Sequence, residues 1–77
     1  MTLSKQEKIE MAMENVEMLI IKLVNDHGRD PIFWEHIIQQ TRLYKNILNP
    51  KTNLWGEGVM YIYGEFIKEI KENGVRF

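Results

Sequence analysis

The sequence predicts an all-α fold, a small bundle of three amphipathic helices that dimerisation completes. Three stretches, at about 5–25, 31–48 and 58–73, repeat apolar residues every three or four positions, which is the spacing of one helix face. Capping or stop residues flank these stretches, and a polar connection containing glycine separates the second from the third. We expect residues 1–77 to form a single helical domain, because a chain of this length supports one core.

The first predicted helix begins at a capping box. Ser4 and Glu7 are three residues apart, so each side chain can accept a hydrogen bond from the backbone N–H of the other. Gly28 is the expected stop, because glycine adopts a positive φ without a Cβ clash. The expected core row is Ile9, Ala12, Val16, Leu19 and Leu23, with Met13, Ile20 and Val24 beside it.

The second predicted helix begins at Asp30 and Pro31. Aspartate is a favoured N-cap, and proline is a favoured first helical residue because its missing N–H would be unpaired there anyway. We expect this helix to run unbroken to Leu48, since Asn49 precedes a proline and is pushed toward extended geometry. The expected core row is Phe33, Ile37, Tyr44 and Leu48, with Trp34 and Ile38 on its flank.

A connection over residues 49–58 leads to the third predicted helix. The connection contains Trp55 among polar residues and glycines. Residues 59–63 are also rich in β-prone side chains, so a short strand is the alternative there. Gly74 is the expected stop of the third helix. Its expected core row is Val59, Ile62, Phe66 and Ile70, joined by Tyr63 and Ile67.

Large apolar residues remain outside the core rows of the first two helices. They are Met11, Met18 and Ile21 in the first, and Ile32, Leu43 and Ile47 in the second. A domain of this size buries only about 60% of its unfolded surface, and the absence of cysteine excludes disulfides. The surplus predicts a partner, and we expect a homodimer formed by helix pairing. The predicted self-association residues are Ile32, His36, Leu43 and Ile47.

An acidic row lies beside the surplus residues of the first helix. Glu7, Glu10, Glu14 and Glu17 have no lysine or arginine four positions on, which is where a helical ion pair would form. The row predicts a surface for a basic, apolar protein partner, and a merely solvated helix face is the alternative. The predicted partner-binding residues are Glu10, Met11, Glu14, Glu17, Met18 and Ile21, with Trp34 and Trp55 as aromatic anchors.

DNA binding is the alternative function. The first two helices and the tight link at 27–30 resemble a helix-turn-helix. However, the chain has 10 basic and 11 acidic residues, and the second helix begins with apolar and acidic side chains at 31–35. A recognition helix needs basic or amide side chains near its start, and Arg42 and Lys45 come too late for that. These features argue against nucleic acid as the main ligand.

A carboxylate-dependent enzyme is the remote alternative. Pairs of glutamates three residues apart resemble, in local spacing, the magnesium-binding carboxylates of all-α nucleotide pyrophosphohydrolases. No pattern of lysine, arginine or aspartate accompanies these pairs. The pairs are Glu7/Glu10, Glu14/Glu17 and Glu69/Glu72.

The function we expect is that of a non-enzymatic module that binds another protein and regulates or inhibits it. We expect no cofactor and no metal, because His27 and His36 have no cysteine or carboxylate at ligand spacing. The longest apolar runs, 18–21 and 59–63, fall far short of the roughly 18 residues of a membrane span. Without a signal-type N-terminus, we expect a cytoplasmic protein. The composition is rich in Ile, Lys, Glu and Asn, which suggests a bacterial or phage source.

Overall fold

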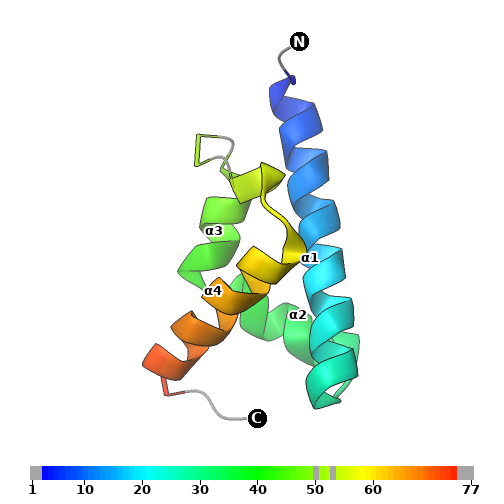
Figure 1. The fold of residues 1–77 in the computed structure, drawn as a ribbon, viewed down its shortest axis with the longest axis vertical. Helices are drawn as coiled ribbons and strands as arrows, with labels where there is room; N and C mark the ends of the chain where they lie inside the picture. The colour runs from blue at the N-terminus through cyan, green and yellow to red at the C-terminus, as the bar shows by residue number, and fades with distance from the viewer. Residues whose placement is uncertain (1–2, 50, 53, 75–77) are drawn as a thin grey trace.

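The protein is all-helical over the residues that its computed structural model describes, which are 3–49, 51–52 and 54–74. The elements are α1 (Lys5–His27), α2 (Pro31–Gln39), α3 (Arg42–Leu48), the short 3₁₀ turn η1 (Leu54–Gly56) and α4 (Val59–Glu72) (Figure 1). Residues 59–63 belong to α4, so the strand alternative is wrong. The predicted all-α class is confirmed, but the described residues form four α-helices and not three.

Helix α1 has both of its predicted end signals. The Glu7 backbone N–H donates to Ser4 Oγ at 3.1 Å, and the Ser4 N–H donates to Glu7 Oε1 at 3.2 Å. Gly28 ends the helix with φ +79°, and its N–H donates to the Val24 carbonyl at 2.9 Å. At about 1.5 Å per residue the helix is about 34 Å long, so it spans most of the 41 Å long axis (Figure 1).

The second predicted helix begins at Pro31 after the Asp30 cap and its last residue is Leu48, as predicted, but its predicted continuity is wrong. The chain breaks into α2 and α3 at Gln40 and Thr41. Thr41 adopts extended geometry, and its Oγ1 accepts from the Tyr44 N–H at 3.1 Å. The same hydroxyl donates to the Ile38 carbonyl at 2.6 Å. Thr41 therefore ends α2 and caps the start of α3, which is a favoured role for threonine.

The break changes which side chains face the core. After it, α3 places Leu43 and Ile47 inside, with 6% and 0% of their surfaces exposed, whereas Ile32 of α2 is 65% exposed. The expectation that these three residues share an outer face is therefore wrong. A continuous helix would have kept them on one side, but Thr41 resets the phase of the turns that follow.

The core lies where the four α-helices meet. The Trp34 ring packs edge-on against Phe66 at 6.4 Å between ring centres, and its Nε1 donates to the Gly28 carbonyl at 2.7 Å. Most of the expected rows of α1 and α4 face inward, but Met13 is exposed. The buried apolar residues are Ala12, Leu19, Leu23, Trp34, Ile38, Leu43, Ile47, Ile62, Phe66 and Ile70.

Candidate protein-binding surface

The outer side of α1 carries a row of exposed apolar side chains. Met11, Met18 and Ile21 are 38%, 50% and 54% exposed, on the side of the helix away from buried Leu19. With Glu14 they follow one another at intervals of three and four residues, so they form one continuous stripe along the helix. We call Met11, Glu14, Met18 and Ile21 the α1 outer strip. The structure thus brings together four of the predicted partner-binding residues.

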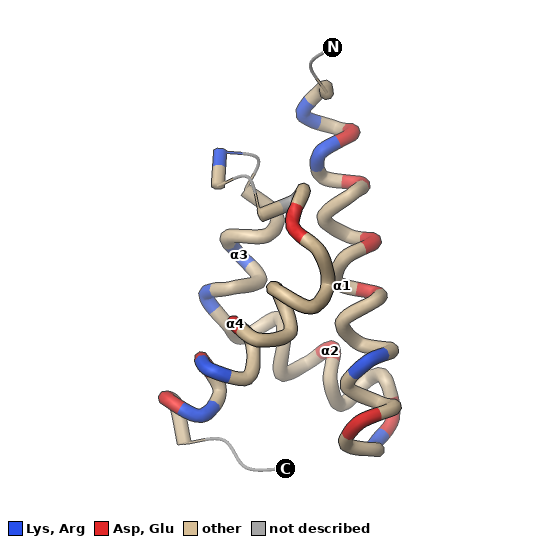
Figure 2. The backbone as a smooth tube through the Cα atoms, viewed as in Figure 1, with Lys and Arg blue, Asp and Glu red and all other residues tan. Residues whose placement is uncertain are grey.

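The acidic side chains around the α1 outer strip are exposed and form no ion pair with a described lysine or arginine. Lys22 Nζ and Asp26 Oδ2 form an ion pair at 3.3 Å, but no ion pair joins Glu10, Glu14 or Glu17 to a described lysine or arginine. Figure 2 shows a run of acidic residues along the middle of α1, with lysines toward both ends of this helix, and a mixture of acidic and basic residues on α4. The α1 outer strip therefore combines exposed apolar side chains with exposed carboxylates.

A groove lies beside the strip, between α1, α2 and α3, and encloses about 310 Å³. We call it the three-helix groove. Its lining is mostly apolar, with two carboxylates and one amide. The lining residues are Met13, Val16, Glu17 and Ile20 from α1, Glu35, Ile38 and Gln39 from α2, and Tyr44 and Leu48 from α3. The sequence did not predict this groove, because the positions of Tyr44 and Leu48 depend on the break at Thr41.

Of the two predicted aromatic anchors, the structure describes the side chain of Trp34 alone. Trp34 is fully buried in the core, so its prediction as a partner-binding residue is wrong. An indole that packs on Phe66 and donates to a backbone carbonyl is a structural residue. The side chain of Trp55 lies outside the described part of the structure, although its backbone belongs to η1.

The predicted self-association surface is not assembled. Ile32 and His36 are exposed on α2, but Leu43 and Ile47 lie in the core. Two exposed residues are too few for a stable interface, since such interfaces bury about 800 Å² on each partner.

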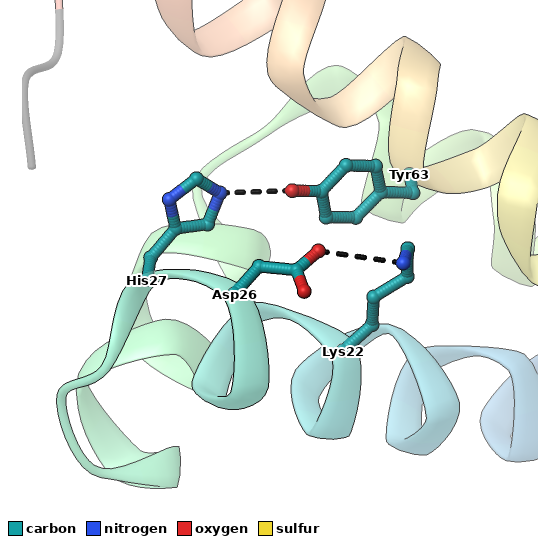
Figure 3. Close-up of polar contacts among 4 residues, drawn as sticks. All are labelled: Lys22, Asp26, His27 and Tyr63. Atoms are coloured by element: carbon teal, nitrogen blue, oxygen red, sulfur yellow. Dashed lines mark hydrogen bonds and ion pairs between the residues drawn. The ribbon is translucent and has the colours of Figure 1, made fainter.

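A polar cluster joins the end of α1 to α4 (Figure 3). His27 Nε2 and Tyr63 Oη share a hydrogen bond of 2.8 Å, and Lys22 Nζ lies 5.0 Å from the centre of the Tyr63 ring. Burial raises the pKa of Tyr63, and a hydrogen bond to Asp26 and the charge of Asp26 raise this pKa further. The arrangement keeps the phenol protonated and holds α4 against α1. His27 is thus a structural residue at the helix end.

A second hollow, of about 400 Å³, lies between α3, η1 and α4. Arg42 and Lys68 line it together with the carboxylates of Glu65, Glu69 and Glu72, so its charge is mixed. The Glu69 carboxylate is already engaged by two backbone N–H groups of α3. Across the described residues, no group of three histidine, cysteine, aspartate or glutamate side chains is placed to hold a metal ion.

No helix in the described ranges is both long enough and apolar enough to cross a membrane. Comparisons of the chain with known protein families, with curated proteins and with solved structures found no match.

Proposed function

We propose that this protein is a non-enzymatic module that binds another protein through the α1 outer strip and thereby regulates or inhibits it. The observation that carries the proposal is the α1 outer strip, whose Met11, Met18 and Ile21 are exposed beside carboxylates that form no ion pair with a described lysine or arginine. Covering three such half-exposed side chains contributes about 3 kcal/mol, at about 1.5–3 kcal/mol for each fully exposed one. This is a useful share of a binding free energy.

Charge favours a different protein over a second copy as the occupant of the strip. In a pairing of two α1 helices, Glu14 and its acidic neighbours would meet the same acidic side chains of the other copy. Such like-charge contacts oppose association, whereas lysine or arginine beside an apolar stripe favours it. The α1 outer strip could be covered by a second copy of the chain or by another protein. We favour a basic amphipathic segment of another protein.

Two exposed methionines provide a matched test of the proposal. Met18 is 50% exposed on α1, and Met60 is 67% exposed on α4, so lysine at either position leaves the core unchanged. In affinity capture from the cells that make the protein, Met18→Lys should reduce the bound partner at least about tenfold, which corresponds to about 1.4 kcal/mol. Met60→Lys should retain the partner. Equal capture by both variants would show that the α1 outer strip is not the binding surface.

DNA binding is a second candidate, favoured by the observed start of α3. Because α3 begins at Arg42, its exposed side chains include Arg42, Lys45 and Asn46, which are types that read base edges and phosphates. In this candidate α2 and α3, which are joined by a two-residue turn, form the helix-turn-helix. The sequence alone indicates the first two predicted helices for that role. Against this candidate stand the short length of α3 and the net charge of −1.

The DNA candidate predicts an affinity that falls as salt rises, because phosphate contacts release counterions. Reversing two charges with Arg42→Glu and Lys45→Glu should then abolish binding to duplex DNA in a gel-shift assay. If the unaltered protein shifts no duplex at low salt, this second candidate is wrong.

A further inference from the structure

We propose that the three-helix groove is the seat of a basic, amphipathic helix from the partner protein. This helix would lay its apolar row on the groove floor and place lysine or arginine at the two carboxylates on the rims. The inference rests on the proposed function and deepens it, because it names the chemistry of the partner and a place for it beside the α1 outer strip.

The shape of the groove fits one side of a helix. Met13 and Ile20 are two turns apart on α1, so this wall is about 10 Å long, and Leu48 of α3 also lines the groove. A partner helix that presents apolar residues at positions i, i+4 and i+7 covers the same length. The volume of about 310 Å³ is at the lower end for ligand-sized cavities, so it admits a row of side chains and not a whole folded element.

The charge of the groove selects a cationic partner. Glu17 of α1 and Glu35 of α2 stand on different walls, both exposed, and neither forms an ion pair with a described residue. Glu35 accepts a hydrogen bond from Gln39 at 3.3 Å, which leaves its charge uncompensated. Among the described residues, no lysine or arginine lines the groove. A helix with positive charge on both sides of an apolar row can pair with Glu17 and Glu35 at the same time.

The exposed α1 row of a second copy does not have this chemistry. Its apolar residues lie among Glu10, Glu14 and Glu17, so docking that row into the groove would bring carboxylates against Glu17 and Glu35. Like charges placed together reject a partner. The charge of the groove therefore favours a segment of a different protein over the α1 row of a second copy.

Fluorescence anisotropy with two labelled peptides tests the inference on the intact protein. Both peptides are helical 15-mers with leucine at positions i, i+4 and i+7, flanked by lysine in one and by glutamate in the other. We expect the lysine peptide to bind at least about tenfold more tightly than the glutamate peptide, and the difference to shrink as salt is added. No binding of the lysine peptide up to about 1 mM, or equal binding of both peptides, would overturn the inference.

Single substitutions separate the groove from the strip. Glu35→Lys and Met13→Lys alter the groove alone, at exposed positions that leave the core intact, and each should weaken the lysine peptide at least about tenfold. Glu14→Lys alters the α1 outer strip alone and should change the affinity by less than about threefold, because the peptide lies in the groove. The far-UV circular dichroism of each variant checks its fold.

The possible failures are distinguishable. If Glu14→Lys and Met18→Lys weaken the lysine peptide while Glu35→Lys and Met13→Lys do not, the groove inference is wrong and the proposed function stands. If none of the four variants weakens the peptide, the α1 side of the molecule is not a binding surface, and both are wrong.

Discussion

Glu69 of α4 caps the start of α3 by accepting a hydrogen bond from the backbone of Arg42. Its Oε2 lies 2.7 Å from the Arg42 nitrogen, and its Oε1 lies 3.0 Å from the Leu43 nitrogen. The first N–H groups of a helix have no partner within that helix, and a carboxylate also suits the positive end of the helix dipole. A residue more than twenty positions away thus stabilises a helix of only seven residues.

Removing this contact should destabilise the protein. We expect Glu69→Ala to lower the free energy of unfolding by about 1–2 kcal/mol, as loss of a helix cap does. Glu72→Ala, at an exposed position on the last turn of the same helix, should change it by less than about 0.5 kcal/mol. Urea denaturation followed by circular dichroism measures both, and equal effects would contradict the capping role.

The hydroxyl of Thr41 should matter as much as the Glu69 carboxylate. Thr41→Ala removes the cap on Tyr44 and the bond to the Ile38 carbonyl, and we expect it to cost about 1 kcal/mol. Because Thr41 and Glu69 stabilise the same helix start, the double variant should lose less than the sum of the single losses. Strict additivity in urea denaturation would show that the two contacts act independently.

Because the helix breaks at Thr41, Leu43 is buried and Ile32 is exposed. Truncating each of them to alanine should therefore change the stability by very different amounts. Leu43→Ala should cost about 2–5 kcal/mol because it empties part of the core. Ile32→Ala should cost less than about 0.5 kcal/mol because the side chain is exposed. Similar melting temperatures for the two variants would contradict the division into α2 and α3.

The Tyr63 cluster predicts a dependence of stability on alkaline pH. Burial and Asp26 raise the pKa of Tyr63 above the ordinary value of 10.0. Between that value and the raised one, the unfolded chain loses the phenol proton while the folded chain keeps it. Stability from this group is therefore complete below pH 10.0 and is lost as the pH rises toward the pKa of the folded state.

Two substitutions check this titration. Tyr63→Phe should remove the part of the alkaline loss that comes from this phenol, as measured by urea denaturation at several pH values. Asp26→Asn should lower the pKa of Tyr63 toward its ordinary value, because it removes the negative charge beside the phenol, and absorbance at alkaline pH reports the shift. An unchanged titration in Asp26→Asn would show that burial alone raises the pKa.

Local signals in the sequence were sufficient for α1 and α4. The capping box at Ser4 and Glu7, the stop at Gly28 and the inward row of Ile62, Phe66 and Ile70 all depend on residues a few positions apart. Such signals are read correctly because the interactions that produce them are themselves local.

The break at Thr41 could not be predicted with the same ease. Apolar residues continue across it at helical spacing, and the threonine is a common N-cap that also occurs inside helices. The start of α3 after Thr41 is also stabilised by Glu69, which accepts hydrogen bonds from two backbone N–H groups of α3. This contact depends on the packing of α4, so it cannot be read from the residues near Thr41. The same packing sets the burial of Leu43 and the walls of the three-helix groove, so that part of the candidate site was not foreseen.

The central claim is that the α1 outer strip is kept for a different protein and not for a second copy of the chain. Light scattering after size exclusion, over a hundredfold range of concentration, tests it most directly. The account predicts a mass of 9.2 kDa throughout, because the acidic strips repel one another. A dimer of about 18 kDa, twice the 9.2 kDa of the chain, that dissociates in Met18→Lys but not in Met60→Lys would contradict it.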